Sequence, residues 1–414
     1  MTNYFEQSLQ LHRQRKGKWA IQSRFPLNNR DDLSVAYTPG VAAVCQAIDD
    51  NICEAYSSTM KGSSVAIVSD GSAVLGLGNI GPQAALPVME GKAILFKEFA
   101  DIDGVPIVLD GHSSDEIIAT VRAIAPTFGG INLEDIAAPT CFEVESALQN
   151  LGIPVFHDDQ HGTAVVLLAA LINAAKVADK PFGSLKVVIN GAGAAGTAIA
   201  KLLLGVGQQP GSFTPVSDVV LCDSKGIIAP NRQDLNAFKH DIVSWSNRNQ
   251  LSGSLRDALV NADVFIGVSK GNLLTAEDIQ TMAERSIIFA MANPIPEILP
   301  EEAKKGGALV VGTGRSDFAN QVNNVLAFPG IFRGALDAMA VRITEGMKIA
   351  AARALATSLS DHELRADYVL PNALDRTVAP RVAEAVRLSA LDEGVVHSVC
   401  GTVEFTQNQE TVVG

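Results

Sequence analysis

The sequence has no apolar segment long enough to cross a lipid bilayer. Its longest apolar stretch, Ala164 to Ala175, is interrupted by Asn173, whereas a membrane-spanning helix needs about 20 consecutive apolar residues. The charged residues near the amino terminus are not followed by an apolar core, so we expect no secretory signal. These absences argue against a membrane protein and lead us to expect a cytoplasmic one.

Cysteine is scarce, and no two cysteines form a CxxC pair. An odd number of scattered cysteines does not suit a disulfide framework, and structural zinc sites use closely spaced pairs. We therefore expect idle thiols in a reducing compartment rather than disulfides or zinc ligands. The cysteines are Cys45, Cys53, Cys141, Cys222 and Cys400.

Positive charge is also in deficit, because 32 lysines and arginines face 45 aspartates and glutamates, for a net charge of −13. Such a chain repels nucleic acid and anionic membranes, so we expect a small-molecule substrate, no nucleic acid and no membrane partner. The short basic run from His12 to Lys18 is interpreted as a solvated helix face, with partner binding as the alternative.

Short apolar runs alternate with helix-like segments along most of the 414 residues, which indicates an α/β fold with parallel sheets. This length suits two domains. We expect an N-terminal α/β catalytic domain at residues 1–160. A doubly wound Rossmann-type dinucleotide-binding domain should follow at residues 161–414, with its C-terminal helices packing back on the first domain.

A glycine-rich turn in the second domain predicts dinucleotide binding. The strand-like segment KVVIN leads into this turn, and a helix-like segment follows it. Glycines there permit a tight turn and let the backbone approach a pyrophosphate at the positive end of a helix. The turn consists of Gly191, Ala192, Gly193, Ala194, Ala195 and Gly196.

The next strand-like segment ends at Asp223, whose carboxylate could accept hydrogen bonds from the ribose hydroxyls. A carboxylate here repels a 2′-phosphate and favours NAD. Ser224 and Lys225 follow directly and could hold that phosphate, so NADP stays possible. A second glycine pattern, Gly76 to Gly81, lacks the terminal acid, and we expect it to shape a loop near the substrate.

Two pairs of acidic residues predict a metal site. Glu134-Asp135 and Asp158-Asp159 each come directly after a strand-like segment. Paired carboxylates without cysteine suit Mg²⁺ or Mn²⁺, which take oxygen ligands. A single pair would be interpreted as a solvated acidic turn, but the second pair in an equivalent place favours a metal. His157 and His161 lack the glutamate of an HExxH motif, so we expect supporting roles rather than zinc binding.

Several motifs together resemble those of malic enzymes, in the short bacterial form without an appended phosphotransacetylase-like domain. They are YTPGVA, SDGSAVLGLGNIG, LPVMEGK, LEDIAAPTCFEVE, FHDDQHGTA, ANPIPE and NQVNNVLAFPG. The resemblance implies oxidative decarboxylation of L-malate to pyruvate and CO₂, with reduction of NAD(P)⁺ and dependence on Mg²⁺ or Mn²⁺. It also implies a homodimer.

The resemblance further implies roles for individual residues. Lys92 would be the general base that removes the C2 hydroxyl proton. It must be neutral for this, and a neighbouring dication and burial would lower its pKa. The other implied roles are metal ligands at Glu134, Asp135 and Asp159, orientation of the lysine by Asp158, protonation of C3 by Tyr37, malate binding by Asn293 and Asn324, and contact with the nicotinamide by Asn323.

One position departs from the pattern. Larger members of the family carry an arginine that clamps a substrate carboxylate where this chain has Ala73, and Arg24 or Arg30 could replace it. Two other functions stay open. A malolactic-type enzyme would use the same residues, keep NAD bound and release lactate. A non-catalytic malate or nucleotide sensor would have no need for Tyr37 and Lys92.

Overall fold

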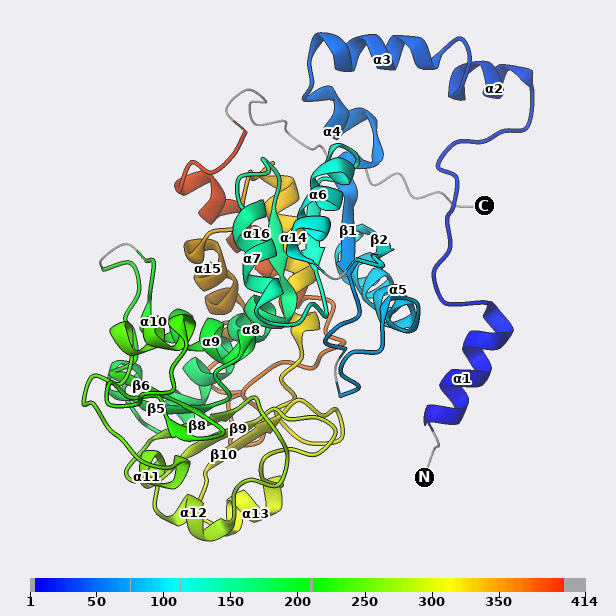
Figure 1. Cartoon of the computed structure of the whole chain (residues 1–414). Coiled ribbons are helices and arrows are strands. Elements are labelled where there is room, and N and C mark those ends of the chain that lie inside the picture. Colours follow the sequence, from blue (N-terminus) through cyan, green and yellow to red (C-terminus); the bar gives the residue numbers. More distant parts are fainter. Residues whose placement is uncertain (1–3, 75, 112, 209–210, 398–414) are drawn as a thin grey trace.

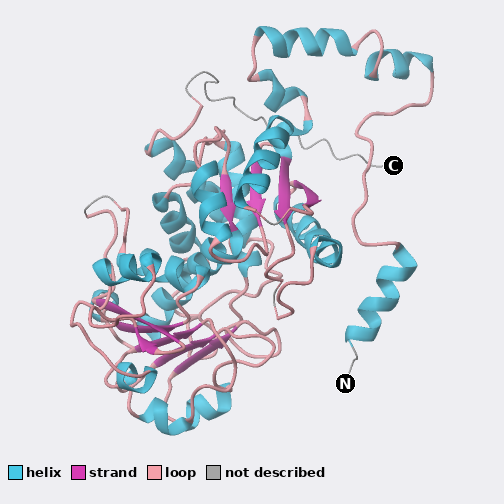
Figure 2. Cartoon of the chain, viewed as in Figure 1, coloured by secondary structure: helices cyan, strands magenta, loops and turns pink. Residues whose placement is uncertain are grey.

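The computed structural model describes residues 4–74, 76–111, 113–208 and 211–397, which fold around two separate sheets (Figures 1 and 2). The first sheet has the order β2-β1-β3-β4, and its strands are parallel. All six residues of β1 are buried, as expected for a strand covered on both faces. The strands are β1 (Ser64–Ser69), β2 (Asp103–Val108), β3 (Gly130–Leu133) and β4 (Val155–His157).

Helices cover this sheet, and the last of them is the central helix of the molecule. This helix, α8, packs on α9 and α15. It is the one helix among the described residues that is long and apolar enough to span a membrane, but most of it is buried inside the protein. The helices of this part are α5 (Pro82–Ala100), α6 (Ser114–Ile124), η2 (Ala125–Thr127), α7 (Thr140–Leu148) and α8 (Asp158–Val177).

The second sheet has the order β10-β9-β8-β5-β6-β7. Its strands are parallel except β7, which forms a tight hairpin with β6. The predicted doubly wound domain is thus confirmed. Its elements are η3 (Phe182–Ser184), β5 (Lys186–Asn190), α9 (Ala194–Leu204), β6 (Asp218–Asp223), β7 (Gly226–Ile227), α10 (Ala237–Trp245), α11 (Leu255–Leu259), β8 (Val264–Gly267), α12 (Ala276–Gln280), β9 (Ile287–Ala290), α13 (Pro300–Lys305) and β10 (Val310–Thr313).

The C-terminal helices return to the first sheet, as predicted. The rings of Phe328 and Phe332 in α14 lie 4.7 Å and 5.4 Å from the ring of Phe96 in α5, in edge-on contacts. One apolar core therefore continues from α5 through α8 into the last helices. These elements are η4 (Asn324–Leu326), α14 (Phe328–Asp337), α15 (Glu345–Ala356) and α16 (Val378–Asp392). The domain boundary predicted at residue 160 falls inside α8 and stays a prediction.

The first helices form an N-terminal arm, residues 4–58, that stands apart from the body (Figure 1). Within this described segment, no residue of the four helices is buried. The arm is tied to the body where the Lys18 amide donates to Glu90 and where Arg24 pairs with Asp103. Its helices are α1 (Tyr4–Arg15), α2 (Arg30–Ala36), α3 (Val41–Asp50) and α4 (Glu54–Ser58), and the short η1 (Met60–Ser63) leads into β1.

The cysteine prediction is only partly correct. Cys45, Cys141 and Cys222 are free thiols, and burial raises the pKa of both Cys141 and Cys222 to about 12. Cys53 is disulfide-bonded, so the expectation of idle thiols is wrong for this residue. Cys400 lies outside the described residues.

Candidate active site

The two acidic pairs meet at the carboxyl edge of the first sheet, because β3 and β4 are neighbours and Leu133 pairs with His157. The acids that follow these two residues therefore start from the same level of the sheet. Glu134, Asp135 and Asp158 are buried, and the Asp159 side chain is 40% exposed. We call these four acids the carboxylate cluster.

Lys92 reaches the carboxylate cluster from α5. Its Nζ lies 2.6 Å from Asp158 Oδ2 and 2.8 Å from Glu134 Oε1, and 4.2 Å from the centroid of the Phe328 ring. Burial on its own would lower the pKa of Lys92, but the attraction of Asp158 and Glu134 outweighs it and raises this pKa above its ordinary value. In this arrangement the carboxylates stabilise the protonated amine. The lowered pKa expected from the sequence requires a neighbouring dication as well as burial, and it stays a prediction.

The position of Asp158 depends on two further residues. A Cβ atom at Gly162 would lie 1.8 Å from Asp158 Oδ1, so this carboxylate keeps its place only because residue 162 is glycine. Asn324 donates from Nδ2 to Asp158 Oδ2 over 3.1 Å, and its Oδ1 accepts from Thr163 over 3.0 Å. Asn324, predicted to bind malate, thus lies in the site and orients Asp158.

The donor set of the carboxylate cluster suits a divalent cation. Lys92 pairs with Asp158 and Glu134. Burial raises the pKa of Glu134 well above its ordinary value, and the neighbouring acids add to this although Lys92 lowers it. Asp158 Oδ1 is buried and has no hydrogen-bond partner among the described residues. A hard dication would relieve this excess of buried negative charge.

The carboxylate oxygens of the three predicted ligands do not surround one point in this structure. Asp159 Oδ2 accepts from the Asp135 amide over 2.8 Å, while Glu134 accepts from Asn132 and Lys92. In the described part of the chain, no three acidic, histidine or cysteine side chains are arranged as ligands of one metal. The assignment of Glu134, Asp135 and Asp159 as ligands therefore stays a prediction.

The His161 side chain and the His157 backbone both contact Glu145 at the start of α8. His161 lies 2.9 Å from Glu145 and 3.1 Å from Lys348, and Glu145 also accepts from the His157 amide. Burial would raise the pKa of Glu145, but the neighbouring His161 contributes to lowering it to about 2. Glu145 and Lys348 were missed in the sequence, where they are 203 positions apart and no spacing connects them.

The glycine-rich turn lies against the first domain. Gly191 has a φ of +123°, and a Cβ atom at Gly196 would lie 1.8 Å from the Gly191 carbonyl oxygen, so both positions need glycine. Ala194 begins α9 and packs against the apolar cluster around Ile136 and Cys141, next to the acidic pairs. The glycine-rich turn, which is predicted to bind the pyrophosphate, thus lies beside the apolar cluster that adjoins the acidic pairs.

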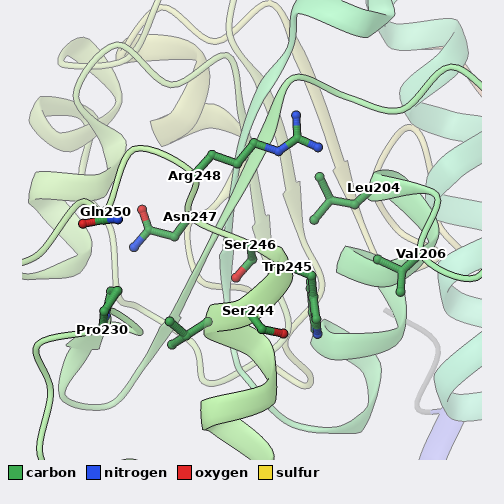
Figure 3. Close-up of a pocket in the computed structure, with 10 residues that line it drawn as sticks. Leu204, Val206, Pro230, Ser244, Trp245, Ser246, Asn247, Arg248 and Gln250 are labelled. Atoms are coloured by element: carbon green, nitrogen blue, oxygen red, sulfur yellow. The ribbon is translucent and has the colours of Figure 1, made fainter.

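The remaining predicted residues are placed as follows. Asn293 follows β9, and its carbonyl oxygen lies 3.9 Å from where a Cβ atom of Gly76 would be, so the Gly76–Gly81 loop approaches Asn293. That this loop lies near the substrate stays a prediction. The Asn323 side chain accepts from the Val325 amide and begins η4. A cavity of about 420 Å³ lined by Leu204, Trp245 and Arg248 lies elsewhere, beside the end of α9 (Figure 3).

Tyr37 is not brought to Lys92 within the chain. It lies between α2 (Arg30–Ala36) and α3 (Val41–Asp50) of the N-terminal arm, and 68% of its surface is exposed. The arginines suggested as replacements at Ala73 are also elsewhere. Arg24 pairs with Asp103 at the opposite edge of the first sheet, and Arg30 begins α2.

Comparison with known proteins identifies the family of this chain. The family description "Malic enzyme, N-terminal domain" matches residues 16–116 and 111–149, and "Malic enzyme, NAD binding domain" matches residues 160–391. The chain belongs to the malic enzyme family. The bifunctional malic/malolactic enzyme of Bacillus subtilis is 54% identical over 413 residues, which cover 99% of both chains. The NAD-dependent malic enzyme of Geobacillus stearothermophilus is 53% identical over 92% of this chain and 78% of its own.

Solved structures of malic enzymes share the fold. The crystal structure of the NAD-dependent malic enzyme from Thermotoga maritima is 48% identical in sequence and superposes with a TM-score of 0.87. The match covers 92% of this chain and 98% of that one. The architecture of a malic enzyme with a nicotinamide-dinucleotide domain is therefore established for this protein.

Proposed function

We propose that this malic enzyme oxidises L-malate with NAD(P)⁺ and decarboxylates it to pyruvate and CO₂, and that it needs Mg²⁺ or Mn²⁺. The observation that carries the proposal is the buried Lys92, held between Asp158 and Glu134 at the end of the sheet that faces the nucleotide turn. A buried amine and acids beside a hydride acceptor are the groups that this reaction requires. The space between the two domains is the expected substrate site, where closure would exclude water.

Lys92 would take the C2 hydroxyl proton as the hydride leaves C2 for the nicotinamide. With Glu134 and its neighbours engaged as metal ligands, the attraction that raises the pKa of Lys92 would be weaker, while burial would still lower it. Asp158 keeps the amine in place, and Asn293 and Asn324 would orient the malate carboxylates. A divalent ion held by Glu134, Asp135 and Asp159 would supply the Lewis acid that stabilises the enolate.

The position of Tyr37 supports a homodimer in which the N-terminal arms are exchanged. The arm exposes large apolar side chains, with exposed fractions of 92% for Phe5, 83% for Ile21 and 66% for Val35. Such a surface is unfavourable in water and suits a partner. A second copy would cover it and could receive Tyr37 beside its own Lys92, where the phenol would protonate C3.

A second candidate activity is the malolactic reaction, in which malate becomes lactate and the cofactor stays bound. The relative from Bacillus subtilis, 54% identical over the full length, is named a bifunctional malic/malolactic enzyme, and this name favours the malolactic reaction as the second candidate. Both reactions share the steps up to pyruvate. They differ in whether pyruvate leaves the site or takes the hydride back from the bound cofactor to become lactate.

The proposal is tested by incubating the protein with L-malate, NAD⁺ or NADP⁺, and Mn²⁺, with and without EDTA. We expect absorbance at 340 nm to rise together with pyruvate, and EDTA to abolish both until excess Mn²⁺ is added. Lactate without free NAD(P)H would identify the malolactic activity instead. Full turnover in EDTA would contradict the metal requirement, and the absence of all products would leave the sensor function.

A further inference from the structure

One buried carboxylate of the second domain has no cation beside it. Glu297 is fully buried, and within the part of the chain that the structure describes, no lysine, arginine or histidine pairs with it. Burial raises the pKa of Glu297 above its ordinary value, although hydrogen bonds from its neighbours lower it in part. Burying such a group is costly, so its hydrogen bonds have to offset the cost.

Each oxygen of Glu297 accepts a hydrogen bond from the end of a different strand. Oε1 accepts from the Ser269 amide over 2.9 Å, and Oε2 accepts from the Ala292 amide over 3.0 Å. These two amides lie two residues beyond the ends of β8 and β9. A Cβ atom at Gly267 would lie 2.3 Å from the carboxyl carbon of Glu297, so the side chain fits here only because residue 267 is glycine.

The same contacts lead to both predicted ligand-binding segments. Asn293 follows Ala292 directly, so the hydrogen bond to the Ala292 amide holds the backbone that carries the Asn293 side chain. On the other side, Ser269 Oγ accepts from Asn190 Nδ2 over 2.7 Å, and Asn190 is the last residue before the glycine-rich turn. Glu297 thus joins the loop of Asn293 to that turn, at the sheet edge where ligands bind in such folds.

A carboxylate is the side chain that these contacts require. The two amides come from separate loops, and a carboxylate offers an acceptor oxygen to each. Glutamine would offer only one, because its NH₂ group is a donor, and an apolar side chain would offer none. The chemistry of residue 297 is therefore matched to holding the two loops together.

We propose that Glu297 is a positioning residue, which places Asn293 for contact with a malate carboxylate and keeps it in register with the glycine-rich turn. Glu297 itself is buried and would touch neither malate nor the nucleotide. This proposal deepens the proposed function and rests on it, because malate is the ligand that Asn293 would bind.

The test is steady-state kinetics of Glu297→Gln, which removes one acceptor and keeps the size of the side chain. We expect KM for malate to rise about tenfold or more, because the contact with a charged acceptor is lost and Asn293 shifts. The value of kcat should stay within about twofold, since the lost contact holds ground state and transition state alike. A merely destabilised protein would have fewer active molecules, which lowers the apparent kcat and leaves KM unchanged.

A double-mutant cycle separates positioning from a general weakening of the site. Asn293→Ala should itself raise KM, and adding Glu297→Gln to it should raise KM no further, because the residue through which Glu297 acts is gone. Glu302→Gln is the matched control. Glu302 pairs with Lys305 on α13, its side chain is 41% exposed, and its replacement should leave KM and kcat unchanged.

A wild-type KM in folded Glu297→Gln protein, or effects that multiply in the double variant, would overturn the proposal. If Glu297→Gln does not fold, Glu297→Asp decides by the same measurements, because its carboxylate keeps the charge but is one carbon too short to reach both amides. Wild-type protein that does not oxidise malate would instead remove the proposed function, and this role of Glu297 with it. The two failures are distinguishable, because only the first is seen in a protein whose wild-type form turns over malate.

Discussion

Replacing Lys92 with alanine should lower kcat by about a hundred- to ten-thousandfold, which is the usual contribution of a general base. The physical reason is that, among the ion pairs of the described residues, Lys92 provides the only amine beside Asp158 and Glu134. Nucleotide binding should be unchanged, because the Gly191–Gly196 turn belongs to the other sheet. Steady-state kinetics with malate and calorimetry with NAD⁺ or NADP⁺ measure the two quantities.

The control for this variant is Lys97→Ala on the same helix. Lys97 pairs with Asp101 and Asp103, and its side chain is 52% exposed. Its loss should leave kcat within about twofold, since exposed ion pairs contribute little. A Lys92→Ala protein that folds, binds nucleotide and turns over malate at nearly the wild-type rate would refute the base assignment.

Two inactive variants, Tyr37→Phe and Lys92→Ala, should restore activity when their chains form mixed dimers. With exchanged arms, a mixed dimer has one complete site, made by Lys92 of one chain and Tyr37 of the other. Random pairing of equal amounts should give about a quarter of the wild-type activity, because about half the dimers are mixed and each has one of two sites. The activity of co-expressed, differently tagged chains measures this.

An arrangement without exchanged arms predicts a different activity for the mixed dimers. If Tyr37 acts beside Lys92 of its own chain, every site in a mixed dimer lacks one of the two groups. Activity would then stay at the residual level of the separate variants. That result would contradict the exchange of arms, whereas an active Tyr37→Phe protein would instead remove the role of Tyr37.

The sequence was sufficient where neighbouring residues carry the information. Glu134-Asp135 and Asp158-Asp159 follow strands that proved to be adjacent, so their place at the same edge of the sheet could be predicted from strand order. The glycine-rich turn is likewise a local feature, because its conformation depends on glycines that follow β5 directly.

The sequence was insufficient where contacts join distant segments or require a partner. Arg232 and Lys239 reach Asp223 from 9 and 16 positions away, and no pattern relates them. The pKa of Lys92 depends on how close Asp158 comes, which is a matter of packing. The arm around Tyr37 could not be placed either, because a helix that packs on another chain has the same apolar pattern as one that packs on its own.

A crystal grown with Mn²⁺ and examined by anomalous diffraction tests the carboxylate cluster most directly. We predict one Mn²⁺ in each chain, with oxygen atoms of Glu134, Asp135 and Asp159 at about 2.0–2.3 Å, in the range of hard-cation ligands. The Glu134 oxygen would then have left Lys92. No anomalous peak at saturating Mn²⁺, with Glu134 still paired to Lys92 and Asp159 still bound to the Asp135 amide, would contradict a metal-dependent site.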